Sequence, residues 1–268
     1  MIVTVQGVDA YCYTGGKPFD AARPSAIFIH GAQNDHSVWA LQTRYFAHHG
    51  FNVLAVDLPG HGRSKGAAMD SVEKMAAWVL AVMDAVGVDK ALLIGHSMGS
   101  LIALEASHMA PQRVSHLAML GTTYPMKVSD ALLETSKNDE QAAIDMVNIF
   151  SHSTMAHKPS CPGPGFSVMG GARRLMQRMS QINPQQLFYT DFFACNAYAN
   201  GQLAAEAVRC PVLFLFGAKD MMTPARSTKL LTSAIAHGKV VQVDSGHSLM
   251  SEQPDAVLDA LFAFANGR

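Results

Sequence analysis

The sequence has no excess charge of either sign, few cysteines and no long hydrophobic run. Its 268 residues carry 20 basic and 21 acidic side chains, a formal net charge of −1, so no electrostatic signal points to a nucleic-acid partner. The cysteines form no C-x-x-C pair, which favours reduced, mostly buried thiols over a disulfide framework. Their even number keeps the disulfide alternative open; they are Cys12, Cys161, Cys195 and Cys210.

Segments that would carry the chain to or across a membrane are also lacking. The apolar run from Met75 to Met83 is much shorter than the roughly 20 residues of a spanning helix. The stretch from Met1 to Phe19 lacks the basic and then apolar regions of a secretory signal. These observations predict a cytoplasmic protein with no membrane partner, and they do not indicate an oligomeric state.

The chain does have enough apolar residues for one large core. It is 49% hydrophobic and 15% charged, which excludes a disordered tail. Apolar runs typical of strands alternate with helical patterns, and near-continuous apolar strands indicate a parallel sheet covered on both faces. The predicted fold class is therefore α/β. The expected strands are residues 2–5, 10–13, 25–30, 51–58, 91–94, 114–120, 212–216 and 239–243.

Local signals refine this pattern at two places. The first two strands read as a hairpin whose turn carries Gly7 and Asp9. Asp70, three residues before Glu73, predicts a capped helix start, and that helix is expected to end at Gly87.

The region from Tyr124 to Glu206 interrupts the alternation. It contains no convincing strand, whereas residues 130–150, 172–182 and 185–198 have helical patterns. Prolines and glycines between residues 159 and 171 predict a loop. We therefore expect a core made of residues 1–123 and 207–268, with a helical insertion over residues 124–206.

A candidate nucleophile follows the strand at residues 91–94. The pentapeptide from Gly95 to Gly99 has the G-x-S-x-G pattern, with Ser97 at its centre and a helix after it. Strand before and helix after are the context that a nucleophile elbow requires, and small flanking residues let the two elements approach closely. The alternative is a glycine-rich turn with an incidental serine.

A serine hydroxyl needs a base, and that base needs an orienting carboxylate. Asp220 follows the strand at residues 212–216, and His247 follows the strand at residues 239–243. The order Ser97, Asp220, His247 is the order of nucleophile, acid and base that goes with a G-x-S-x-G elbow. Taken singly, Asp220 could cap a helix and His247 could be a loop histidine. Together they predict a catalytic triad.

Two backbone amides are expected to form an oxyanion hole. One is the N–H of Met98, directly after the nucleophile, and the other comes from the loop after the strand at residues 25–30. Ala32 is the predicted second donor and Gln33 the alternative. Histidine pairs elsewhere have no converging cysteine or carboxylate, so no metal and no cofactor are expected.

These motifs together resemble the α/β-hydrolase fold superfamily, in particular its small serine esterase-type members with a helical lid. The resemblance implies a mostly parallel eight-stranded sheet and a cap, residues 124–206, over the pocket. The matching pieces are His30-Gly31, the stretch from Asp57 to Ser64, Gly95 to Gly99, Gly217 to Asp220 and Gly246-His247.

The resemblance says more about the type of reaction than about the identity of the substrate. Ser97 stands where haloalkane dehalogenases and epoxide hydrolases carry an aspartate, which argues against those reactions. A cofactor-free hydrolase of a carboxylic ester or similar small acyl substrate, acting through an acyl-enzyme, is the leading hypothesis. One alternative is a carbon–carbon bond hydrolase of anionic ring-cleavage products, supported by Arg173, Arg174 and Arg178. The other is a non-catalytic ligand-binding protein on the same scaffold.

Overall fold

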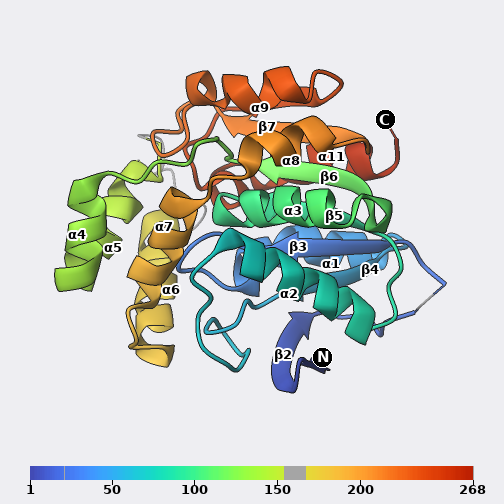
Figure 1. Ribbon diagram of the computed structural model, residues 1–268, viewed down its shortest axis with the longest axis horizontal. Coiled ribbons are helices and arrows are strands. Elements are labelled where there is room, and N and C mark those ends of the chain that lie inside the picture. Colours follow the sequence, from blue (N-terminus) through green and yellow to red (C-terminus); the bar gives the residue numbers. More distant parts are fainter. Residues whose placement is uncertain (21, 154–166, 268) are drawn as a thin grey trace.

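An eight-stranded sheet crosses the middle of the molecule (Figure 1). The computed structural model describes residues 1–20, 22–153 and 167–267. Strands run in the order β1-β2-β4-β3-β5-β6-β7-β8, antiparallel at β1/β2 and β2/β4 and parallel elsewhere. The predicted α/β class and mostly parallel eight-stranded sheet are confirmed. The strands are β1 (Ile2–Val5), β2 (Val8–Tyr13), β3 (Ser25–Ile29), β4 (Asn52–Val56), β5 (Ala91–His96), β6 (Val114–Leu120), β7 (Val212–Gly217) and β8 (Lys239–Val243).

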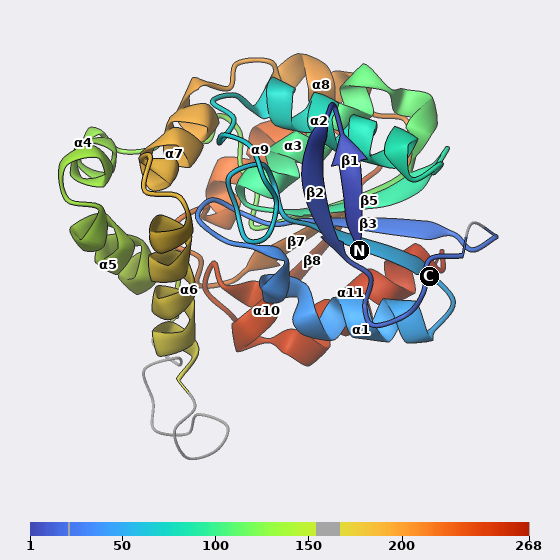
Figure 2. The ribbon, with the colours of Figure 1, turned by 90° about the horizontal axis from the view of Figure 1, so that it is seen from below.

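Helices cover both faces of the sheet (Figure 2). Each face contributes its own apolar cluster, as the continuously buried sequences of β3, β4, β5 and β7 require. One face is covered by α2 (Val72–Ala85), α3 (Met98–Met109), α8 (Gly201–Ala207) and α9 (Lys229–Ala234), the other by α1 (Ala40–His48), α10 (Leu249–Glu252) and α11 (Pro254–Ala265). Short 3-10 turns are His36–Trp39, Pro111–Arg113 and Ala225–Thr228.

Two local predictions in the amino-terminal half were wrong in detail. Helix α2 is capped by Ser71, whose side chain accepts from the Lys74 N–H. Asp70 instead pairs with the Lys74 ammonium group at 2.7 Å. Asp9 lies within β2, because the tight turn needs only Gln6 and Gly7, both at positive φ.

The inserted helices gather at one end of the sheet (Figures 1 and 2). They are α4 (Asp130–Asn138), α5 (Glu140–Phe150), α6 (Val168–Ile182) and α7 (Leu187–Ala197). They share an apolar cluster that includes Ile144, Met176 and Phe188. Helix α8, which the sequence did not predict, buries Ala204 and Ala205 in the core cluster that α3 also joins.

Inside the insertion, two expectations were wrong. Residues 130–150 form two helices, because Asp139 leaves the helical conformation and caps α5 by accepting from the Ala142 N–H. Gly170 and Gly171 lie in the first turn of α6 and not in a loop. The remaining prolines and glycines of the predicted loop, residues 159–165, lie outside the described residues.

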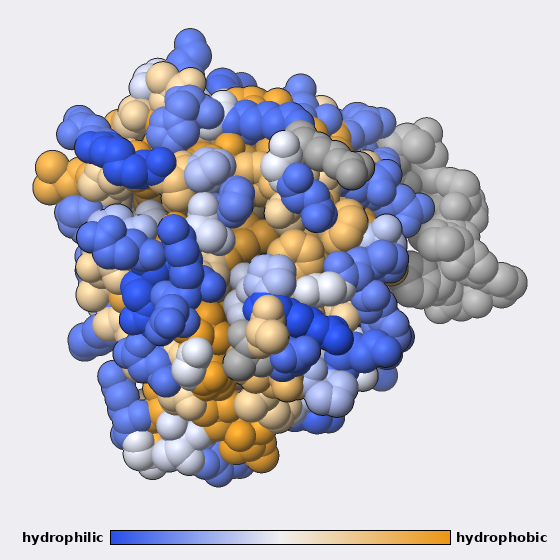
Figure 3. Space-filling model, turned by 90° about the vertical axis from the view of Figure 1, so that its right-hand side faces the viewer, coloured by the Kyte–Doolittle hydropathy of each residue, from blue (hydrophilic) through white to orange (hydrophobic). Residues whose placement is uncertain are grey.

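The surface and the cysteines add little to the architecture. Figure 3 looks at the end opposite α4–α7, where hydrophilic and hydrophobic residues are intermingled. No helix in the described ranges has the length and apolar character needed to cross a bilayer. Cys12, Cys195 and Cys210 are free thiols, and Cys161 lies outside the described residues.

Candidate active site

Ser97 occupies a strained turn between β5 and α3. Its backbone has φ 53° and ψ −120°, a conformation that costs a side-chain-bearing residue about 1–3 kcal/mol. The flanking glycines permit it: a Cβ on Gly95 would lie 2.1 Å from the Gly99 carbonyl oxygen, and one on Gly99 would lie 2.3 Å from that of Ile29. The G-x-S-x-G spacing therefore follows from the close packing of β5, α3 and β3.

Asp220 lies just beyond β7 in a shell of hydrogen-bond donors. Its Oδ1 accepts the backbone N–H groups of Met222 and Thr223, each at 2.8 Å, and its Oδ2 accepts the Thr223 hydroxyl at 2.7 Å. Burial raises the pKa of Asp220, but the charge of His247 and these hydrogen bonds outweigh it and hold the pKa well below its usual value. Asp220 is a buried, ionised carboxylate.

His247 follows β8 and contacts Asp220 directly. Its Nδ1 lies 2.8 Å from Asp220 Oδ2, and a carboxylate can only accept, so Nδ1 carries the proton. The other ring nitrogen, Nε2, is then an acceptor when the ring is neutral. Gly121, at the end of β6, leaves room for the ring, since a Cβ there would lie 3.1 Å from two of its atoms.

His96 holds the backbone of His247, a role that the sequence did not indicate. Its Nε2 donates to the His247 carbonyl oxygen at 2.9 Å. Burial, together with the charge of His247, lowers the pKa of His96 to about 3, so its ring is neutral. The G-x-S-x-G pattern leaves the residue before the serine unspecified, and nothing local could have revealed this contact.

The expected oxyanion donors belong to the loop after β3 and to the first turn of α3. Gly31 brings the loop close, because a Cβ there would lie 3.2 Å from Ser97 Cβ. Gln33 is occupied, since its N–H donates to Asp191 Oδ2 at 2.7 Å. Within the described ranges no acceptor takes the N–H of Ala32 or of Met98. This arrangement favours Ala32 over Gln33.

A cavity of about 240 Å³ joins these residues to the inserted helices. Ser97, Ala32 and His247 line it, and most other lining side chains are apolar. The further lining residues are Met126, Lys127, Val128, Ser129, Leu132, Met146, Val147, Phe150, Phe192, Cys195, Met221, Met222 and Thr223. The structure thus brings Ser97 and His247 to one cavity and Asp220 into contact with His247.

The arginines of α6 do not contribute to that cavity. Arg173, Arg174 and Arg178 are not among its described lining residues. Arg173 is half-exposed and pairs with Asp145 of α5, with Nε 2.6 Å from Oδ1. The support that these arginines were expected to give to an anionic substrate is therefore not found at this site, where Lys127 is the basic side chain among the described lining residues.

Among the described residues, one group of potential metal-ligand atoms converges, and it lies next to β4. Asp35, His36 and Asp57 bring oxygen and nitrogen atoms within 4.8 Å of one another. Asp57 accepts the N–H groups of His36 and Arg63 and contacts the His36 ring, while Asp35 accepts from Ser37. The three side chains are close together because they form hydrogen bonds that hold the loops after β3 and β4 in place.

The chain is similar to known proteins both in sequence and in structure. A family model described as alpha/beta hydrolase fold matches residues 24–160. The chain is 25% identical over 246 residues, 89% of each sequence, to an (E)-2-((N-methylformamido)methylene)succinate hydrolase of Acinetobacter baylyi. An enol-lactonase from Burkholderia xenovorans superposes with a TM-score of 0.85 at 21% identity, covering 99% of this chain and 100% of its own. An esterase from Exiguobacterium antarcticum superposes at 0.81 with 17% identity, covering 99% of each.

Proposed function

Because the chain belongs to the alpha/beta hydrolase fold family, we propose that it is a serine hydrolase that cleaves a carboxylic ester or similar acyl compound. The observation that carries the proposal is the 2.8 Å contact between Asp220 and His247 at a cavity that also contains the strained Ser97. No cofactor is needed for this reaction.

The proposed mechanism uses each group according to its protonation state. His247 Nε2 takes the proton of Ser97 as the hydroxyl oxygen attacks the substrate carbonyl carbon. Asp220 keeps the proton on Nδ1 and stabilises the imidazolium that forms. The ring then protonates the departing alcohol, and water, activated by the same ring, hydrolyses the acyl-enzyme.

The amides of Ala32 and Met98 would receive the negative oxygen of each tetrahedral intermediate. Met98 lies at the start of α3, and Ala32 follows Gly31, whose backbone lies close to Ser97. Such a donor, placed before the charge develops, contributes about 3–4 kcal/mol to transition-state stabilisation.

Helices α4–α7, which lie within residues 124–206, are assigned as the cap of the site. They supply most of the apolar cavity wall, including Leu132, Met146 and Phe192. A cavity of this size and character suits a short or medium acyl group. Lactones are cyclic esters, and one structural neighbour is described as an enol-lactonase, so a small lactone is a second substrate form of the same chemistry.

The test of the proposed function is a substrate panel with purified protein. Short aryl esters, a small lactone and an anionic dienone are offered under one set of conditions. We expect turnover of an ester or lactone and none of the dienone. Cleavage of the dienone alone would instead support the carbon–carbon bond hydrolase, and no turnover of any member together with simple ligand binding would support a non-catalytic role.

Met146→Trp should shorten the acyl range of the enzyme. Met146 lies on α5 and lines the cavity, so an indole there removes space from the end of an extended acyl chain. One methylene in an apolar pocket is worth about 1–3 kcal/mol, and we expect kcat/KM for a hexanoate ester to fall about tenfold or more relative to an acetate ester.

The matched control is Met109→Trp. Met109 is exposed at the far end of α3, and its replacement should leave the hexanoate-to-acetate ratio unchanged. An unchanged ratio in Met146→Trp as well would show that the acyl group does not enter this cavity.

A further inference from the structure

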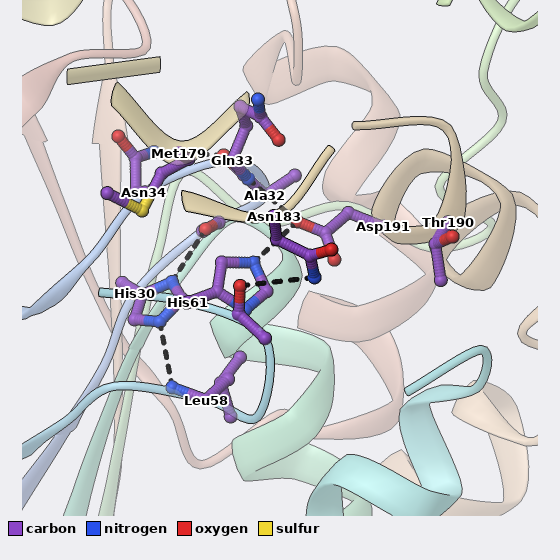
Figure 4. Close-up of polar contacts among 12 residues, drawn as sticks. His30, Ala32, Gln33, Asn34, Leu58, His61, Met179, Asn183, Thr190 and Asp191 are labelled. Atoms are coloured by element: carbon purple, nitrogen blue, oxygen red, sulfur yellow. Dashed lines mark hydrogen bonds and ion pairs between the residues drawn. The ribbon is translucent and has the colours of Figure 1, made fainter. Parts of the chain in front are cut away.

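A buried polar cluster lies beside the loop that carries Ala32 (Figure 4). Its centre is Asp191 of α7, whose Oδ2 lies 2.9 Å from His61 Nε2 and accepts the Gln33 N–H at 2.7 Å. The side chains of Asp191, His61 and Gln33 are all fully buried. Asp191 therefore joins a cap helix to the loop after β4 and to the loop that carries Ala32.

Both ring nitrogens of His61 face acceptors, which favours an imidazolium in this cluster. Its Nε2 faces the Asp191 carboxylate and its Nδ1 faces the Pro59 carbonyl oxygen at 3.1 Å. Both partners only accept, and a neutral ring has a single N–H to donate. Burial lowers the pKa of His61, but the charge of Asp191 and these hydrogen bonds, with a contribution from Asp57, raise it above its usual value. The geometry and the raised pKa favour a buried ion pair between Asp191 and His61.

His30 stands beside this pair and is neutral. Its ring lies 4.8 Å from that of His61; its Nδ1 donates to the Gly31 carbonyl oxygen at 2.8 Å, and its Nε2 accepts the Leu58 N–H at 3.1 Å. Burial, followed by the charge of His61, lowers the pKa of His30 to about 4. The two rings are tilted by 53° to each other, and the contacts of His30 fix it as a single neutral tautomer.

These contacts fix both peptide planes next to Ala32. The Gly31 carbonyl belongs to the peptide that carries the Ala32 N–H, and in a trans peptide the two point in opposite directions. His30 therefore sets the direction of the Ala32 N–H from one side. Asp191 fixes the following peptide through the Gln33 N–H. The loop keeps this shape although Gln33 has a φ of 56°.

The side chain of Gln33 ties the same loop to two more cap helices. Its Nε2 donates to Ser180 Oγ at 2.9 Å, and to the Met176 carbonyl oxygen and Glu140 Oε1 at 3.1 Å each. The oxyanion loop is thus bound to α5, α6 and α7. Movement of the cap would be transmitted to this loop through Asp191 and Gln33.

We propose that Asp191 is a positioning residue of the oxyanion hole, which places the Ala32 amide correctly only while α7 is seated on the core. This inference rests on the proposed function of Ala32. It predicts that loss of the Asp191 charge impairs catalysis more than substrate binding, although Asp191 is not among the described residues that line the cavity.

The test compares Asp191→Asn with Asp145→Asn, measured with an aryl ester and with a fluorophosphonate that labels the nucleophile. Displacing a catalytic group by about 1 Å can cost 100-fold, so we expect Asp191→Asn to lower kcat about 10- to 100-fold while KM stays within about threefold. The labelling rate should fall with kcat, because the phosphonyl oxygen occupies the same hole. Asp145 forms an ion pair with Arg173 on the cap surface, and its variant should keep both rates.

A folded Asp191→Asn variant with wild-type kcat, or with a loss confined to KM, would overturn the proposal. Should that variant fail to fold, His61→Gln replaces it, with the same expected loss of kcat and the same contradicting outcomes. Failure of the proposed function is visible separately, as a wild-type protein that neither hydrolyses esters nor is labelled at Ser97.

The wild-type protein offers a test of the ion pair that needs no activity. Nitrogen-15 NMR should detect protons on both ring nitrogens of His61 at neutral pH, and a single ring N–H would overturn the cluster. Because the folded pKa of His61 is raised, the pair stabilises the fold fully below pH of about 6.5 and loses this contribution as the pH rises through the folded pKa. The difference in Tm between wild type and Asp191→Asn should therefore shrink at alkaline pH.

Discussion

Ser97→Ala should lower kcat for an aryl ester by about 10⁶-fold, the loss measured for the nucleophile of an analogous triad. The substitution removes the attacking oxygen and leaves the elbow intact, because alanine fits the same strained backbone without new contacts. The binding cavity and the oxyanion amides are untouched, so KM for any residual reaction should change little. The measurement is a steady-state assay of protein shown to be folded.

The matched control for this variant is Ser107→Ala on the same helix. Ser107 is buried near the end of α3, where its hydroxyl donates to the Leu104 carbonyl oxygen, and its loss should leave kcat within a fewfold of wild type. Equal activities of Ser97→Ala and the wild-type protein would remove Ser97 from the mechanism.

Asp220→Asn is expected to cost about 10⁴ in kcat, as the same change does in an analogous triad. The local hydrogen bonds explain why. Two backbone N–H groups point at Oδ1, so the amide oxygen of asparagine would take that place and its NH₂ would face His247 Nδ1. The ring would then carry its proton on Nε2, where it cannot accept the proton of Ser97.

Asp244→Asn controls for the loss of a nearby negative charge. Asp244 follows β8 and forms an exposed ion pair with Lys219 at 2.7 Å, and exposed pairs of this kind contribute little. We expect kcat to stay close to wild type. An Asp220→Asn variant that also retained wild-type kcat would mean that another carboxylate orients His247.

The strands and the three proposed catalytic residues could be predicted from the sequence because their signals are local. Buried parallel strands such as β5 and β7 are continuous apolar runs, and the carboxyl ends of such strands lie along one edge of the sheet. Ser97, Asp220 and His247 each follow a strand, so their convergence at that edge is a consequence of topology.

Contacts between distant segments could not be predicted in the same way. Asp191 and His61 are 130 positions apart, and neither belongs to a motif that names the other. In a single sequence, Asp191 is an acidic residue within a mainly apolar helix, and its burial depends on how α7 is seated on the core. The chain leaves the helical conformation between α4 and α5 at Asp139. The only local signal for this break is that aspartate is a common helix-capping residue.

The most direct test of the account is to locate the fluorophosphonate adduct by mass spectrometry of the digested protein. We expect one phosphonylated peptide, containing Ser97, in the wild-type protein, and little or no adduct in His247→Ala under the same conditions. An adduct on a different serine, or labelling of Ser97 that does not depend on His247, would contradict the claim that these two residues act as nucleophile and base.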